Sequence, residues 1–88
     1  MLVLLDEAIQ LANTLTERQL RVVLAESCTA GLASAALAQV PGISEWHCGS
    51  AVTYREGTKE AWLGVSAADI KQQTAVSDPV ARQMAAGV

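Results

Sequence analysis

The sequence predicts a mixed α/β domain built around a parallel sheet. Residues 21–25 form a short apolar run without alternation, which is typical of a strand covered on both faces. An amphipathic helical pattern precedes this run, and an alanine- and leucine-rich helical stretch follows it after a tight turn. With 88 residues, 51% of them hydrophobic, the chain has enough material for one core, so we predict a single domain.

The first predicted helix begins at about residue 5. Its apolar side chains recur at helical spacing and its polar side chains take the other side, which predicts about four turns that lie on a sheet. The apolar positions are Leu5, Ala8, Ile9, Ala12 and Leu15.

The next unit reads as strand, turn and helix. After the strand at residues 21–25 come small and polar residues, and helical composition resumes over residues 32–40. Pro41 and Gly42 end that helix, because proline cannot continue it and glycine tolerates the backbone conformation that follows. Residues 46–54 then predict a second strand, rich in β-branched and aromatic residues at its end.

Glycine and serine mark the boundaries of the remaining elements. Gly49 predicts a bulge in the second strand, and Gly64 closes a helix over residues 55–63. Ser66 is placed to cap a short helix that follows, with Asp69 three positions on as in a capping box.

The last predicted helix begins after Ser77, which is placed to cap it, and Pro79 lies in its first turn. One face of this helix is apolar. That face comprises Val80, Ala81, Met84, Ala85 and Val88.

Two strands make an incomplete sheet, since a two-stranded sheet is marginal by itself and α/β layers need several strands. Either the chain is a fragment or the missing strands come from another molecule. Both alternatives leave apolar surface in need of cover, so we expect a homo-oligomer.

Charge and composition exclude several classes of protein. The formal net charge of -3 has the wrong sign for a protein whose affinity comes from neutralising phosphates, so we expect no nucleic-acid ligand. No stretch approaches the roughly 18 apolar residues of a membrane helix, so we expect no membrane partner. The two cysteines, Cys28 and Cys48, are too few for a secreted disulfide scaffold, which favours reduced thiols in the cytoplasm.

Chemistry is expected where the two strands end, because ligands of α/β sheets bind outside the carboxyl ends of the strands. Ser27 and Cys28 follow the first strand and offer a hydroxyl or a thiol nucleophile. The turn after them offers anion-binding amide groups near Thr29. Tyr54 ends the second strand, and Lys59 lies about one turn into the next helix, so the arrangement resembles a serine–lysine amidohydrolase.

Each of these residues also has a structural interpretation. Ser27 and Thr29 are suited to cap the helix that follows, and Cys28 to be a small buried hydrophobe. Tyr54 would pack with its hydroxyl in water, and Lys59 would be a solvated helix charge.

Glu26 follows a buried strand, so its carboxylate needs a partner. It could bind a backbone amide, pair with Lys59 or orient the nucleophile. His47, the only histidine, is interpreted as a satisfied, partly buried ring, and its side chain points away from that of Cys48 on a strand. We therefore expect no metal, and no phosphate-loop or dinucleotide motif indicates a cofactor.

Several motifs together resemble the C-terminal domain of the CinA family, the competence/damage-inducible proteins, which is also found alone as nicotinamide mononucleotide deamidase. The resemblance runs along the whole chain but covers about the first half of the family domain. The motifs are Ala25-Glu26-Ser27-Cys28-Thr29-Ala30-Gly31, Val40-Pro41-Gly42, Val52-Thr53-Tyr54 with Lys59, Leu63-Gly64-Val65 and Ala75-Val76-Ser77.

This resemblance implies a three-layer α/β/α fold and hydrolysis of the amide of nicotinamide mononucleotide to nicotinate mononucleotide and ammonia, a step of pyridine nucleotide salvage. Ser27 would be the nucleophile, Lys59 the general base or proton relay, and Tyr54 a partner that orients or polarises. Thr29 and Gly31 would shape the turn and the phosphate or oxyanion environment.

The resemblance also bears on the rest of the site and on the extent of the domain. Glu26, Cys28 and Thr53 are expected to contact the substrate alongside the residues above. Residues 1–88 are interpreted as the N-terminal portion of one such domain, inactive until the domain is complete. The rival hypothesis is a non-catalytic nucleotide-binding or oligomerising module of the same fold.

One departure from the family pattern concerns Ala30, which stands where the family usually has glycine. If this position needs a positive φ, the alanine methyl carries a steric cost. Ser50 and Ala51 also depart from the expected pattern, and Ser50 adds a hydroxyl of open meaning.

Overall fold

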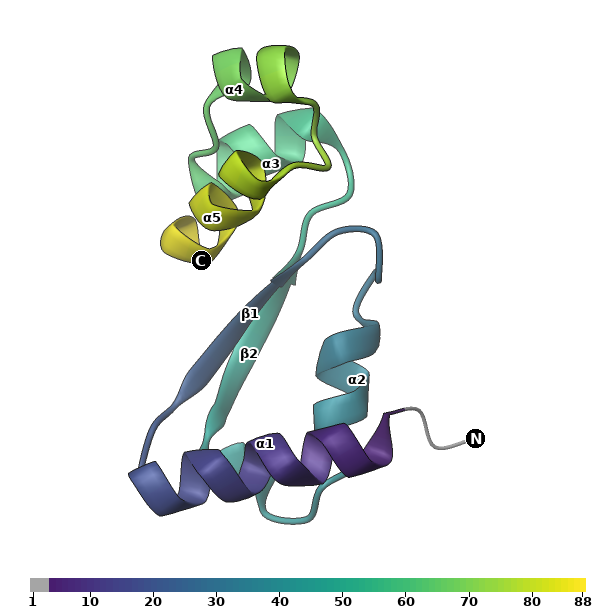
Figure 1. Ribbon diagram of the computed structural model, residues 1–88, viewed down its shortest axis with the longest axis vertical. Coiled ribbons are helices and arrows are strands. Elements are labelled where there is room, and N and C mark those ends of the chain that lie inside the picture. Colours follow the sequence, from purple (N-terminus) through teal and green to yellow (C-terminus); the bar gives the residue numbers. More distant parts are fainter. Residues whose placement is uncertain (1–3) are drawn as a thin grey trace.

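The structure, a computed structural model, describes residues 4–88 and has a mixed α/β fold (Figure 1), which confirms the predicted class. Two parallel strands are accompanied by five α-helices and a short 3-10 helix within these residues. The elements are α1 (Leu5–Arg18), β1 (Val22–Glu26), α2 (Leu32–Ala38), η1 (Ile43–Glu45), β2 (His47–Val52), α3 (Glu56–Leu63), α4 (Ala67–Gln73) and α5 (Asp78–Gly87).

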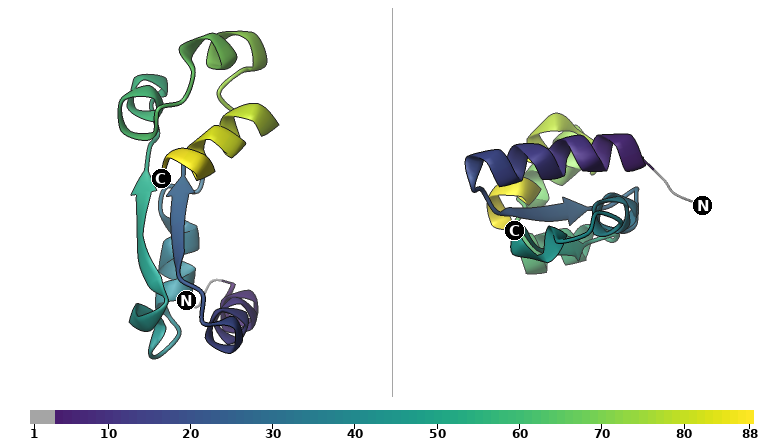
Figure 2. Two further views of the ribbon diagram at one scale, coloured as in Figure 1. Left: turned by 90° about the vertical axis from the view of Figure 1, so that its left-hand side faces the viewer. Right: turned by 90° about the horizontal axis from the view of Figure 1, so that it is seen from below.

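The two strands run side by side and end at the same edge of the sheet. Their register pairs Val23 with Gly49 and Glu26 with Val52. The register slips once, between Val22 and the next residue, and Gly49 has a φ of +142° there, which confirms the predicted irregularity. Helices α3, α4 and α5 gather beyond the carboxyl ends of the strands, and α1 lies at the other end (Figure 2).

The first helix departs from its predicted packing. It buries Ala8, Ala12 and Leu15, but its main partner is α2 and not the sheet. Ile9, predicted to be on the apolar face, is 41% exposed. The reason is geometric: the three buried residues form a narrow stripe at spacings of four and three, and Ile9 lies about 100° around the helix from Ala8.

The strands are also less covered than predicted. Val23 is 45% exposed, so the expectation that β1 is covered on both faces is wrong for the described residues. Helix α2 contacts both strands and α5 contacts β1, but a sheet of two strands leaves much of its surface open.

A compact apolar cluster joins the last three helices and the loop before α4. It consists of Leu63, Val65, Ile70, Val80 and Met84, with Ala25 and Ala51 from the strands packed against it. Gly64 closes α3 with a φ of +67°, as predicted. This cluster attaches the helical part to the carboxyl ends of the strands, where the candidate site lies.

Side chains at the helix starts confirm one predicted cap and correct another. The backbone amide of Asp69 donates to Ser66 Oγ at 3.2 Å, so Ser66 caps α4. The second half of the capping box is taken by Gln83 of α5, which accepts from the Ser66 amide at 2.7 Å and donates to Asp69 Oδ2 at 2.6 Å. Ser77 does not cap α5, because its hydroxyl donates to the carbonyl of Thr74 at 2.9 Å.

The other boundaries differ little from those predicted. Helix α2 ends at Ala38, two residues before the predicted end, and Gly42 adopts a φ of +81° after Pro41. Among residues 4–88, no helix has the combined length and apolarity that crossing a bilayer requires.

Candidate active site

Ser27 and Lys59 meet at the carboxyl ends of the strands. Lys59 Nζ donates a hydrogen bond to Ser27 Oγ at 2.9 Å. Ser27 is the first residue after β1, and Lys59 lies in the first half of α3, the helix that follows β2. Because parallel strands end at one edge, the two residues that leave these ends are brought together, as the strand-end rule predicts.

The Lys59 side chain is buried, with 3% of its surface exposed. Its second contact is to the backbone carbonyl of Tyr54 at 3.5 Å. Within residues 4–88, no carboxylate forms an ion pair with it, and the salt bridge that does occur joins Arg82 to Asp78 on the surface of α5. Among the described residues, the Lys59 amine is therefore enclosed with the serine hydroxyl and this carbonyl as its polar contacts.

Tyr54 reaches the pair through its backbone only. Its side chain is 66% exposed, and the phenol hydroxyl has no hydrogen-bond partner among the described residues. Among the described residues, the Tyr54 phenol therefore makes no contact that would orient Ser27 or Lys59. What Tyr54 supplies is its carbonyl oxygen, held at the end of β2 where Lys59 can reach it.

Glu26 forms hydrogen bonds with the turn and with the start of α2. Its Oε1 accepts from Thr29 Oγ1 at 2.7 Å and from the amide of Ala33 at 2.9 Å, and its Oε2 accepts from the amide of Ser34 at 2.9 Å. Of the two partners that the sequence left open, backbone amides are observed and Lys59 is not. Only 5% of Glu26 is exposed and both of its oxygens accept hydrogen bonds from the chain itself, so the contacts observed for its side chain are structural.

These contacts determine the ionisation of Glu26. Desolvation acts to raise the pKa of the carboxyl, but hydrogen bonds from the Thr29 hydroxyl and from the backbone amides of Ser34, Ala33 and Gly31 outweigh it. The net result is a pKa below the ordinary glutamate value, so Glu26 is a carboxylate at neutral pH.

The turn between β1 and α2 uses two residues in the left-handed region. Ala30 has a φ of +52° and Gly31 a φ of +99°, so the position where the family usually has glycine does adopt a positive φ. The Ala30 amide donates to the carbonyl of Ser27 at 2.9 Å. The amides expected near Thr29 to bind an anion are thus mostly engaged, because Glu26 holds those at the start of α2.

Thr53 is fully buried, and its Oγ1 contacts no polar partner in the described part of the molecule. Its amide donates to the backbone carbonyl of Glu26 at 2.9 Å and so extends the pairing of the two strands. Among the described residues Thr53 is thus an interior side chain, and its expected contact with substrate stays a prediction.

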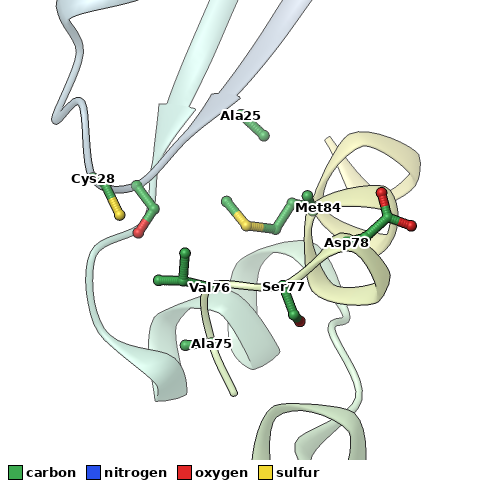
Figure 3. Close-up of a pocket in the computed structure, with 9 residues that line it drawn as sticks. Ala25, Cys28, Ala75, Val76, Ser77, Asp78 and Met84 are labelled. Carbon is green, nitrogen blue, oxygen red and sulfur yellow. The ribbon is translucent and has the colours of Figure 1, made fainter. Parts of the chain in front are cut away.

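A pocket of about 500 Å³ opens beside Ser27 (Figure 3). One wall is formed by the end of β1 and the turn after it, the other by the loop before α5 and by α5 itself. Figure 3 shows Met84 extending from α5 toward the strand side of the pocket. The lining residues are Ala25, Ser27, Cys28, Ala75, Val76, Ser77, Asp78, Ala81 and Met84.

Cys28 lines this pocket with an exposed, unpaired thiol, which corrects the expectation of a buried hydrophobe. The hydrogen bond from Lys59 goes to Ser27 and not to this thiol, so the hydroxyl is the group with the lysine amine beside it. Cys48 is likewise exposed and unpaired.

The pocket wall from residues 75–84 was not predicted as part of the site. The motif Ala75-Val76-Ser77 marks this segment in the sequence, but the motif alone does not indicate that it lines a pocket. Apolar residues of an amphipathic helix indicate burial, but they do not indicate which cavity the helix borders.

His47 lies at the start of β2, opposite Val22, while Ser27 follows the other end of the neighbouring strand. Its Nε2 is 2.8 Å from Ser34 Oγ, and its buried Nδ1 has no partner among the described residues, so the ring is only half satisfied. A serine–histidine pair with Ser27 is excluded by this placement. Residues 4–88 contain no cluster of three His, Cys, Asp or Glu side chains that could hold a metal ion.

The fold and this geometry define an α/β domain with a serine and a buried lysine in contact at the strand ends. A family model described as the CinA C-terminal domain matches residues 6–88. The chain therefore belongs to the CinA C-terminal domain family.

Curated relatives and solved structures agree with this assignment. A CinA-like protein of Chlorobaculum tepidum is 46% identical over 85 residues, which are 97% of this chain and 20% of that protein. A CinA-like protein of Mycobacterium tuberculosis is 49% identical over 76 residues, which are 86% of this chain and 17% of that protein. The chain spans about a fifth of the length of these relatives.

Two crystal structures show the same fold at higher coverage. A CinA superfamily protein from Escherichia coli is 32% identical with a TM-score of 0.91, covering 97% of this chain and 49% of its own. The competence/damage-inducible protein CihA from Agrobacterium tumefaciens is 36% identical with a TM-score of 0.88, covering 93% of this chain and 50% of its own. The chain thus spans about half the length of these solved relatives.

Proposed function

We propose that the protein is an amidohydrolase in which Ser27 attacks a carboxamide and Lys59 moves the protons. The observation that carries this proposal is the 2.9 Å contact between Ser27 Oγ and the buried Lys59 Nζ. A serine hydroxyl is a weak nucleophile until a neighbouring base takes its proton, and an unpaired buried amine is such a base.

The reaction divides into two balanced steps. First, the Ser27 hydroxyl gives its proton to Lys59 Nζ while Oγ bonds to the amide carbon, and Lys59 then returns the proton to the amide nitrogen as the carbon–nitrogen bond breaks and ammonia leaves. In the second step, water gives a proton to Lys59 and attacks the acyl–serine ester. The ester bond breaks, Lys59 returns that proton to Ser27 Oγ, and the product is a carboxylic acid, which ionises to the carboxylate by releasing its proton to the ammonia or to solvent.

The proposed substrate is nicotinamide mononucleotide, which yields nicotinate mononucleotide and ammonia. The resemblance to the deamidase of this family supports this choice, and so does the largely apolar pocket beside Ser27, whose size suits an aromatic ring. The protein is proposed to act in the cytoplasm as a homo-oligomer. Exposed apolar side chains on the open sheet, Val23 and Val52 among them, are compatible with self-association.

The test is ammonia release from nicotinamide mononucleotide by the purified full-length gene product, with nicotinamide riboside as the comparison substrate. We expect release with the wild type and none above background with Ser27→Ala. Ser44→Ala, at an exposed serine after the end of α2, is the matched control and should retain full activity. Unchanged activity of Ser27→Ala would remove Ser27 from the mechanism.

The rival function is a nucleotide-binding or oligomerising module without catalysis. The open sheet surface is the observation that favours it. Calorimetry separates the two: binding of nicotinamide mononucleotide by the wild type, with no ammonia released over hours, would support the module.

A further inference from the structure

We propose that Glu26 is the positioning residue of the reactive serine, a side chain that touches no substrate but holds the turn carrying Ser27 against α2 and β2. The inference rests on the proposed function, because it assigns a task within the same reaction. It is carried by the placement of one buried carboxylate among three segments of the chain.

The first of these segments is the turn itself. Thr29 Oγ1 donates to Glu26 Oε1 at 2.7 Å, the short distance expected when a hydroxyl binds a charged acceptor. Ser27 lies between these two residues in sequence, so the hydrogen bond closes a small loop around it. The turn includes Ala30 and Gly31 at positive φ, a conformation that is kept only when surrounding contacts favour it.

The second segment is the start of α2. This helix has Gly31 at its N-cap position and therefore no capping side chain of its own. The amides of Ala33 and Ser34 donate instead to the two oxygens of Glu26, each at 2.9 Å. A residue outside the helix thus does the work of an N-cap, and the position of the serine turn is tied to the position of the helix.

The third segment is the end of β2. The backbone carbonyl of Glu26 accepts from the amide of Thr53 at 2.9 Å, one residue before Tyr54, whose own carbonyl contacts Lys59 Nζ. The side chain of Glu26 therefore locates Ser27 relative to α2, and its backbone locates Ser27 relative to the segment that leads to Lys59. These contacts of Glu26 hold Ser27 in the position where it meets Lys59.

The substitution Glu26→Gln would break these hydrogen bonds while keeping the size of the side chain. One carboxylate oxygen would become an NH₂ group that faces an amide donor of Ala33 or Ser34, so a hydrogen bond would be replaced by a repulsive contact. A small displacement of the turn after β1 would then separate the Ser27 hydroxyl from the Lys59 amine.

The experiment measures the reactivity of Ser27 directly, by the rate at which a fluorophosphonate probe labels it, together with kcat and KM for ammonia release. We expect Glu26→Gln to lower both the labelling rate and kcat by roughly 10- to 100-fold with KM changed less than about twofold. Thr29→Val removes one of the donors to the Glu26 carboxylate and should lower both the labelling rate and kcat by a smaller factor. Glu45→Gln, at an exposed glutamate of η1, is the matched control and should change neither.

Circular dichroism supplies the folded fraction of each variant, and labelling rates are compared per folded molecule. A folded Glu26→Gln with wild-type labelling and kcat would overturn the inference, and so would a loss that disappears after this correction. If Glu26→Gln does not fold, Thr29→Val decides, since it leaves the contacts to α2 in place.

The proposed function can fail separately. A wild-type protein that is labelled at Ser27 but releases no ammonia would overturn the amidase, and the ratio of labelling rates would still decide the role of Glu26.

Discussion

Ser27 Oγ and Lys59 Nζ lie 2.9 Å apart although 32 positions separate the two residues along the chain. The contact joins two successive strand–helix units: Ser27 follows β1, and Lys59 lies in α3, the helix after β2. The contact is also shielded from solvent on the lysine side, because Lys59 is almost completely buried.

Replacing Lys59 by methionine should abolish catalysis while preserving the fold. Methionine keeps much of the apolar stem that packs in the interior and removes the amine that accepts the serine proton. We expect the rate of ammonia release to fall by roughly 100- to 10,000-fold, the range for loss of a general base. Lys71→Met, at an exposed lysine of α4, is the control and should retain activity, and equal activity of both variants would contradict the role of Lys59.

Replacing Ala30 by glycine should stabilise the protein. Ala30 has a φ of +52°, where its methyl group is unfavourable by about 1 kcal/mol and glycine is not. Urea denaturation should therefore show a higher midpoint with an unchanged slope. Ala35→Gly, in the interior of α2, is the matched control and should lower stability by about 1 kcal/mol, and a decrease in both variants would show that the turn gains nothing from glycine.

Acid should weaken the fold through Glu26. Its pKa is lower in the folded chain than in the unfolded one, so its stabilisation is fully present above the unfolded pKa and is lost as the pH falls through the folded pKa. Comparing urea denaturation at about pH 7 and about pH 3, Glu26→Gln should reduce the loss of stability on acidification. If the wild type and the variant lose the same free energy of unfolding, the carboxylate does not contribute in this way.

Filling the pocket should weaken substrate binding. Ala81→Phe places a large ring in the wall that α5 contributes, and we expect KM for nicotinamide mononucleotide to rise by roughly tenfold or more. Ala85→Phe adds the same ring at an exposed position of the same helix that does not line the pocket, and its KM should stay near the wild-type value. Equal KM values for the two variants would place the substrate elsewhere.

Local pattern in the sequence accounts for most of the elements. Gly64 and the Ser66 cap were predicted because each depends on a conformation or a hydrogen bond within a few residues. The meeting of Ser27 and Lys59 followed from a rule of parallel sheets, which requires only that two strands be identified and ordered.

What the sequence did not predict depends on residues far apart in the chain. The partners of Glu26 lie seven and eight positions away, across a turn whose shape is not encoded by periodicity. The role of Gln83, which takes the second half of the expected capping box and links α5 to the start of α4, has the same origin. The exposure of Val23 depends on how many strands lie beside it, which a pattern within the strand does not report.

The placement of the two reacting side chains on consecutive strand–helix units has a consequence during synthesis. While residue 59 is still inside the ribosome, the emerged serine has no amine beside it and is an ordinary alcohol. In the proposed mechanism, it becomes reactive only when β2 has paired with β1 and α3 has brought Lys59 beside it. Under this mechanism the serine stays unreactive in the nascent polypeptide. Chemical labelling of the serine would therefore report when the second strand–helix unit has packed against the first.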